Sequence, residues 1–238
     1  MLLALQGLAL TLGVLMLVWI ITLHRCARIR NSPDHAVENP PTFQLTFGSR
    51  PATWLAIHAN DPLAVETALG ISQSTPCPWV EGMTGDHEFF VGPPLNGWIV
   101  VTGSGLPNPS CDVDECFLFL TGISHKLGSV QFFQADRVLH HHAWVRLEKG
   151  LVIRAYAWTG ETVWHEGRKT DAENELSMKC SGYGDDPNVN SWAAVEWTAA
   201  NVGKVPLLAA RWSLDPARVD GRLRKHADGV AGKSPRPH

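Results

Sequence analysis

Three consecutive histidines, His140, His141 and His142, are the residues of this 238-residue chain whose types most directly suggest chemistry. Alternate side chains of a β-strand share a face, so a strand here would place His140 and His142 on one side and His141 on the other. Two such imidazoles can bind a metal ion, but a site needs a third or fourth ligand with supporting hydrogen bonds. Further ligands would have to come from elsewhere: His165 with Glu166, or His87 with Asp86. The alternative is that these are exposed or hydrogen-bonded strand histidines.

The patterns typical of nucleophilic catalysis do not occur in the sequence. Gly103-Ser104-Gly105 and residues 181–184 do not fit the G-x-S-x-G elbow. Cys77 stands between Pro76 and Pro78, and no histidine is obviously paired with it.

Acid–base and phosphate-binding patterns give no better indication. Asp185 and Asp186 precede Pro187, an order more typical of a helix start than of a catalytic carboxylate pair. The sequence contains neither G-x-x-x-x-G-K-[ST] nor G-x-G-x-x-G. We therefore predict no catalytic residue, no cofactor-binding residue, no metal ligand and no cofactor, and we favour a protein that is not an enzyme.

Charge is distributed unevenly along the chain. Residues 31–216 carry 11 Lys and Arg against 21 Asp and Glu, whereas residues 217–238 carry six Lys and Arg against two Asp. An acidic body repels phosphate backbones, so nucleic acid is not expected as its partner. The five cysteines form an irregular set without a C-x-x-C pair, which is more typical of a reducing compartment than of a disulfide framework.

The longest apolar stretch is residues 1–23, where Gln6 is the only strongly polar side chain. A membrane-spanning helix needs about 20 apolar residues, so the stretch predicts a transmembrane helix. Arg25, Arg28 and Arg30 follow it; Arg25 does not suit a signal cleavage site, and the positive-inside rule then places the rest of the chain in the cytoplasm. The sequence thus predicts a single-pass membrane protein, with membrane lipid as one partner.

Composition divides the chain into four regions. Residues 1–23 are the predicted transmembrane helix, and residues 24–51 are a basic collar and Pro-rich linker. Residues 52–216 are a predicted soluble α+β domain. Residues 217–238 form a basic tail without a core-forming pattern, which we predict to be disordered.

Apolar runs and turn residues predict the elements of the domain. In chain order they are a strand at 53–57, a helix at 63–69, a loop at 72–83, a hairpin of 88–92 with 98–102, a helix at 113–127, strands at 130–133, 138–147, 151–158 and 162–164, a loop at 168–184, a helix starting at 186–187, and a closing segment at 206–216. Asp61 before Pro62, and Asp112 with Glu115, are typical helix starts.

The first six elements match the split β-α-β ferredoxin-like arrangement, in which an antiparallel sheet carries its helices on one face. The expected fold class is therefore a single N-terminal transmembrane helix plus an α+β domain, with an antiparallel sheet of ferredoxin-like type that a meander extends. Most of the ten tryptophans are expected in the core, and one or two exposed ones would mark a docking face.

Five segments of the predicted domain are distinctive: Trp54-Leu55-Ala56-Ile57, Pro76-Cys77-Pro78-Trp79, Gly97-Trp98-Ile99-Val100-Val101, Arg154-Ala155-Tyr156 and Trp212-Ser213-Leu214-Asp215-Pro216. Through them residues 53–216 resemble a group of uncharacterised bacterial proteins without an assigned activity. The resemblance implies a bacterial protein, and because the group has no assigned activity it carries over no catalytic residue.

Two functions follow as hypotheses. The first is a non-enzymatic interaction protein of the bacterial inner membrane, an accessory or structural subunit of a larger complex that has an integral membrane protein as its partner. The second is an anchored ligand- or metal-binding, even enzymatic, cytoplasmic domain that uses the His140–His142 region. Its pocket would combine these residues: His140, His142, His165, and Arg137 or Arg154.

Overall fold

A computed structural model describes residues 51–185, 192–219 and 228–234 of the chain. Its strands are β1 (Thr53–His58), β2 (Ser72–Pro78), β3 (Phe89–Val91), β4 (Trp98–Thr102), β5 (Ser129–Ala135), β6 (His142–Glu148), β7 (Leu151–Trp158), β8 (Thr162–Glu166) and β9 (Asp228–Lys233). Its helices are α2 (Pro62–Leu69), α3 (Trp79–Gly82), α4 (Val113–Leu127), α5 (Asp171–Glu175), α6 (Trp192–Trp212) and the short 3-10 helix η1 (Pro216–Arg218).

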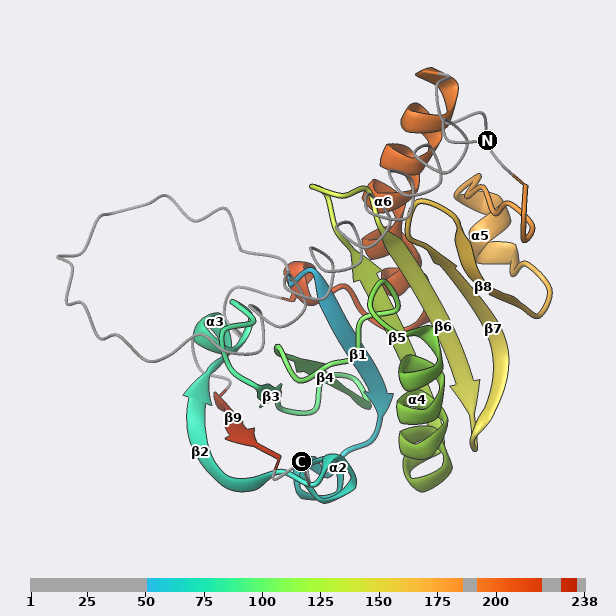
Figure 1. The fold of residues 1–238 in the computed structure, drawn as a ribbon. Coiled ribbons are helices and arrows are strands. Elements are labelled where there is room, and N and C mark those ends of the chain that lie inside the picture. Colours follow the sequence, from blue (N-terminus) through green and yellow to red (C-terminus); the bar gives the residue numbers. More distant parts are fainter. Residues whose placement is uncertain (1–50, 186–191, 220–227, 235–238) are drawn as a thin grey trace, which may run out of the picture. The chain divides into compact units, whose positions relative to one another are not determined.

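The described strands form one antiparallel sheet in the order β2-β9-β3-β4-β1-β5-β6-β7-β8 (Figure 1). The central strand, β1, pairs with β4 on one side and with β5 on the other. Strands β5 to β8 are a meander of consecutive neighbours. Strand β9, which comes from the end of the chain, lies between β2 and β3.

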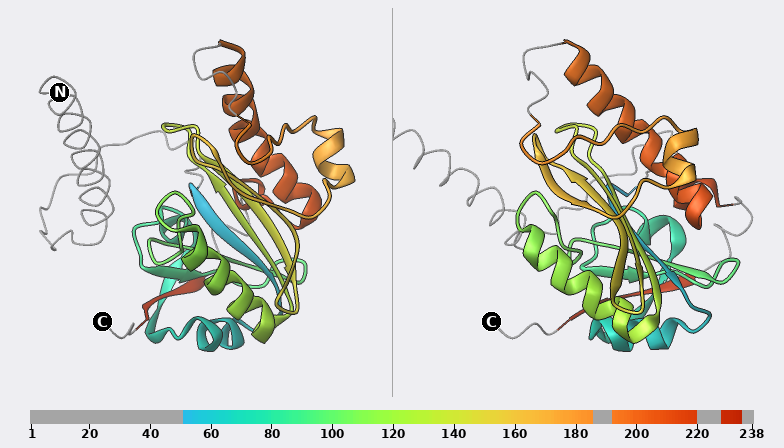
Figure 2. Two further views of the ribbon diagram at one scale, coloured as in Figure 1. Left: turned by 45° about the vertical axis from the view of Figure 1, so that its right-hand side comes forward. Right: turned by 90° about the vertical axis from the view of Figure 1, so that its right-hand side faces the viewer.

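Each face of the sheet carries an apolar cluster. Side chains of a strand alternate between the two faces, so neighbouring residues of β1 belong to different clusters. On one face Leu55 and Ile57 of β1 pack in a cluster with apolar side chains of α2 and α4. On the other face Trp54 and Ala56 pack in a second cluster with α6. Figure 2 shows α4 on one side of the sheet and α6 on the opposite side. This double coverage explains why β1 reads as a continuous apolar run rather than an alternating one.

The helix ends follow the signals in the sequence. Asp61 Oδ1 accepts a hydrogen bond from the backbone N of Leu63 at 3.0 Å, and α2 ends at Gly70, whose φ is +71°. Asp112 Oδ1 likewise accepts from the backbone N of Glu115 at 2.9 Å and caps α4. The predicted starts of both helices are confirmed.

Replacing Asp112 by alanine is expected to destabilise the protein by about 1 kcal/mol, because the N-terminal backbone donors of α4 lose their cap. The matched control is Asp114→Ala. It removes an equal negative charge from the first turn of α4 but leaves the cap in place, so it should cost only about 0.3 kcal/mol of stability. Urea denaturation measures both. Equal losses for the two variants would show that charge, not capping, is what Asp112 contributes.

The structure contradicts the predicted fold class. Within the described residues no helix combines the length and the apolar character needed to cross a membrane, and the stretch predicted to do so, residues 1–23, lies outside them. The prediction of a single-pass transmembrane protein is therefore not retained. The described part of the domain contains nine strands, and its helices cover both faces of the sheet rather than one, since α6 lies opposite α4. The α+β character and the antiparallel sheet agree with the prediction.

Several element predictions also differ from the structure. Residues 72–83, predicted as a loop, form β2 and α3, and part of the segment predicted as a disordered tail forms β9. The predicted loop at 168–184 contains α5, and α6 continues through Pro206, where we expected the closing segment to begin. The predicted helix start at 186–187 lies outside the described residues. In β2 every residue except Cys77 is exposed, so the strand lacks the apolar alternation that would have revealed it.

Candidate functional site

The three consecutive histidines do not share a strand. His140 has a positive φ of 56° and lies in the turn that precedes β6, so only His142 belongs to the strand. His141 is held elsewhere, with its Nδ1 2.9 Å from the Oγ of Ser110. The predicted alternation of His140 and His142 on one strand face is therefore wrong.

His142 is buried, and both of its ring nitrogens have hydrogen-bond partners. Its Nδ1 lies 3.1 Å from the carbonyl oxygen of His140, which can only accept, so Nδ1 donates. Its Nε2 then accepts from the side-chain amide of Asn201 on α6 at 3.2 Å. Burial is the main cause that lowers the pKa of His142 to about 4. The neutral imidazole joins β6 to α6 and leaves no nitrogen for a metal ion.

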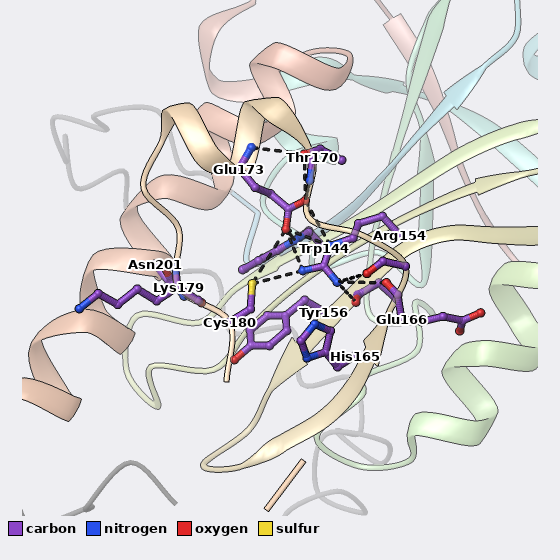
Figure 3. Close-up of polar contacts among 12 residues, drawn as sticks. Trp144, Arg154, Tyr156, His165, Glu166, Thr170, Glu173, Lys179, Cys180 and Asn201 are labelled. Atoms are coloured by element: carbon purple, nitrogen blue, oxygen red, sulfur yellow. Dashed lines mark hydrogen bonds and ion pairs between the residues drawn. The ribbon is translucent and has the colours of Figure 1, made fainter. Parts of the chain in front are cut away.

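Arg154 and Glu173 form an ion pair inside the domain (Figure 3), with 1% and 0% of their side chains exposed. The Arg154 Nε donates to both carboxylate oxygens at 3.0 and 3.2 Å, and Nη2 donates to Oε1 at 2.9 Å. Trp144 Nε1 donates to the same Oε1 at 2.8 Å, and Thr170 donates to Oε2 through its backbone N and its hydroxyl. Burial alone would raise the pKa of Glu173, but these hydrogen bonds outweigh it, and the pKa is lowered.

The remaining donors of Arg154 are also used inside the protein. Its Nη1 donates to three backbone carbonyl oxygens, those of Ala155, Glu166 and Gly167, and its Nη2 donates to the Sγ of Cys180 at 3.2 Å. Burial raises the pKa of Cys180 to about 11, so this thiol is not a nucleophile at neutral pH. The cluster fastens α5 and the segment around Cys180 to the sheet.

The segment after α5 also covers β8, the outer strand of the meander. The Tyr183 hydroxyl accepts from the backbone N of His165 at 2.7 Å, and His165 Nδ1 lies 3.1 Å from the carbonyl oxygen of Ser181. Arg137 is exposed in the turn after β5. The rings of His142 and His165 and the guanidinium of Arg154 lie 6.0, 5.5 and 5.9 Å from the ring centroid of Tyr156. His140 and Arg137 lie in the turn between β5 and β6, so the structure brings together three of the five residues of the predicted pocket.

A different set of side chains does come together at the other end of the sheet. Cys77 at the end of β2, Glu81 on α3 and His87 before β3 place their Sγ, carboxylate oxygen and ring nitrogen within 4.8 Å of one another. Cys77 Sγ lies 3.5 Å from His87 Nε2, and that nitrogen lies 3.4 Å from Glu81 Oε1. Across residues 51–185, 192–219 and 228–234 no other group of three such ligands is found.

Backbone contacts hold the segments that carry these three residues. The carbonyl oxygen of Gly82 accepts from the buried hydroxyl of Thr102 on β4 at 2.7 Å, which fixes α3 against the sheet. A Cβ at Gly82 would lie 2.2 Å from the Phe90 ring, so only glycine allows α3 to pack this closely. The carbonyl oxygen of His87 accepts from the backbone N of Ser104 at 2.9 Å.

Burial differs among the three ligands. Cys77 is 3% exposed, whereas the side chains of His87 and Glu81 are 30% and 59% exposed. The carboxylate of Glu81 and the ring of His87 are therefore accessible to solvent, whereas the sulfur of Cys77 is buried. Burial, followed by the charges of Glu81 and Asp228, raises the pKa of Cys77. A cation at this place would favour the thiolate instead.

The sequence predicts no site from this group, although it draws attention to two of its members. No partner histidine is expected for Cys77, and His87 is expected only as a further ligand for the His140 region. The available signal was the short spacing Cys77-x3-Glu81-x5-His87 next to two prolines. This spacing indicates proximity only if the chain reverses between 77 and 87, and α3 supplies that reversal.

Comparison of the chain with protein-family models, with curated proteins and with solved structures finds no match. The resemblance of residues 53–216 to uncharacterised bacterial proteins stays a prediction.

Proposed function

We propose that this protein binds a divalent transition-metal ion, with zinc the best fit, through Cys77, Glu81 and His87. The separations between the ligand atoms carry the proposal. In a tetrahedral zinc site, with Zn–S about 2.3 Å and Zn–N and Zn–O about 2.0–2.2 Å, sulfur and nitrogen lie about 3.6 Å apart and nitrogen and oxygen about 3.4 Å apart. The corresponding distances are 3.5 Å and 3.4 Å.

The types of ligand also favour zinc. Thiolate selects soft or borderline metal ions, and imidazole suits zinc, copper, iron and nickel. The thiolate and the carboxylate together neutralise the charge of a divalent ion. Calcium and magnesium prefer oxygen ligands alone, so the sulfur of Cys77 disfavours both.

A Cys-His-Glu hydrolase is the competing function for the same residues, and two observations disfavour it. In such a triad the carboxylate orients the imidazole through one ring nitrogen while the thiol faces the other. Here Cys77 Sγ and Glu81 Oε1 both lie close to His87 Nε2. In addition, a nucleophilic cysteine needs a lowered pKa, and that of Cys77 is raised.

Zinc titration of the purified full chain tests the proposal. We expect the wild-type protein to bind one Zn²⁺ at this site and Cys77→Ser to weaken that binding at least tenfold, roughly, because a thiolate ligand is lost. Glu81→Gln should weaken it less, since its side chain is mostly exposed and replaceable by water. A competing zinc-sensitive dye gives the affinities.

The matched control is Cys111→Ser, which removes an exposed thiol outside the group. Its zinc affinity should equal that of the wild type. A wild-type protein without zinc affinity, or Cys77→Ser and Cys111→Ser variants with equal affinities, would refute the proposal.

The sequence-based hypothesis of a non-enzymatic accessory subunit is compatible with such a site, because a metal ion that joins segments of the fold needs no catalytic role. That hypothesis, its membrane-protein partner, the exclusion of nucleic acid and the bacterial inner-membrane location stay predictions.

A further inference from the structure

The metal ligands belong to two segments that flank the C-terminal strand. Cys77 is in β2, and His87 lies just before β3, while β9 occupies the position between β2 and β3 in the sheet. Among the described strands, β2 pairs with β9 alone. The position of Cys77 relative to His87 therefore depends on a strand that lies about 150 residues further along the chain, from Asp228 to Lys233.

Both ligand-bearing segments contact β9 directly. In the ladder with β2, Cys77 is paired with Gly229 and Thr75 with Ala231. On the other side, β3 pairs with β9, and the carboxylate of Glu88, the residue after His87, accepts from the backbone N of Ser234, the residue after β9, at 3.1 Å. The sulfur of Cys77 and the side chain of Ala231 belong to the same buried cluster. Removal of β9 would therefore expose Cys77 and release the segment that carries it.

The fit of β9 between its neighbours is close. A Cβ at Gly229 would lie 2.4 Å from the carbonyl oxygen of Val91 and 2.6 Å from the Phe90 ring. Both distances are shorter than the van der Waals contact of any carbon with these atoms. A single methyl group at position 229 is thus enough to disturb the strand without shortening the chain.

We infer that metal binding by Cys77, Glu81 and His87 locks the C-terminal strand β9 into the sheet, and that β9 in turn completes the metal site. The inference rests on the proposed function, because it requires the metal ion. Linkage makes the effect reciprocal: a metal ion that binds only when β9 is in place must stabilise β9 by the same factor by which β9 improves the metal affinity.

Hydrogen exchange on the full chain, with and without Zn²⁺, tests the inference. If opening of β9 abolishes the site, free Zn²⁺ at ten times its dissociation constant should slow the exchange of the β9 amides about tenfold. Amides of β8, at the opposite edge of the sheet, exchange through local openings that leave the site intact; they serve as the internal reference and should slow less. Exchange of the β9 amides that stays unchanged, or slows only as much as that of β8, overturns the inference.

The reciprocal measurement uses Gly229→Ala. Displacing β9 should weaken Zn²⁺ binding by about tenfold, whereas the control Gly122→Ala, where an added Cβ meets no atom within 4 Å, should leave it unchanged. Equal zinc affinities of the two variants would also overturn the inference. If the wild type binds zinc through Cys77 but neither effect is seen, the proposed function stands and the inference fails; if the wild type binds no zinc, both fail.

Discussion

Replacing Glu173 by alanine is expected to destabilise the domain by about 3–5 kcal/mol, the largest effect we predict for a single substitution. The carboxylate accepts hydrogen bonds from Arg154, Trp144 and Thr170, and its side chain is fully buried. Without it the guanidinium remains in the interior, where its charge has no counterion, and the indole N–H of Trp144 loses its acceptor. An uncompensated buried charge costs far more than the pair contributes.

Urea denaturation of the variants gives the free energies of unfolding. Thr170→Ala is the control in the same cluster: it removes one neutral donor and an N-cap but no charge, and should cost about 1 kcal/mol. The double variant Arg154→Met with Glu173→Leu removes both charges and should be more stable than Glu173→Ala. A loss of under about 1 kcal/mol for Glu173→Ala, or a double variant less stable than the single one, would contradict this account.

The sequence predicted those elements whose signals are local. Asp112 caps α4 and Gly70 ends α2 because each acts on residues within one turn. The strands of the meander were also predicted, apart from their ends, since short turns such as Lys149-Gly150 separate apolar runs. The strand at 138–147 was predicted too early because the left-handed conformation of His140 is not encoded by hydrophobic pattern.

Strands β2 and β9 were not predictable from the hydrophobic pattern. Strand β2 is exposed at six of its seven positions, and β9 contains Gly229 and Gly232, which lower the intrinsic preference for a strand. Each is stabilised by pairing with the other, a contact between residues about 150 positions apart. The hydrophobic pattern therefore gives no indication of this part of the sheet, where α3 reverses the chain and Cys77 lies close to His87.

The prediction that the helices lie on one face of the sheet was wrong for a similar reason. The periodicity of α4 is visible in the sequence, but nothing local says which face of the sheet a helix covers. Trp54 and Phe133 stack with ring centroids 5.2 Å apart on the face that α6 covers. Aromatic residues on the second face of the sheet were the available sign that this face is also buried, and they explain where many of the tryptophans lie.

Acidification is expected to destabilise the domain through His142 as the pH falls from 6.5 to about 4. The pKa of this buried imidazole is lowered from 6.5 to about 4 in the folded protein, so within that interval the unfolded chain binds a proton and the folded chain does not. The stability contributed by neutral His142 is complete above pH 6.5 and is lost as the pH falls to about 4. The loss is on the order of 3 kcal/mol, from about 1.4 kcal/mol for each pH unit.

Comparison of the wild type with His142→Asn isolates this contribution, because other groups titrate in both proteins. The variant costs stability at neutral pH, since it disturbs the contact with Asn201 and the stacking on Trp144. The difference in unfolding free energy between the two proteins should then shrink by on the order of 3 kcal/mol between pH 6.5 and 4. A difference between wild type and His142→Asn that does not change with pH would show that His142 is protonated in the folded state, with its Asn201 contact reversed or lost.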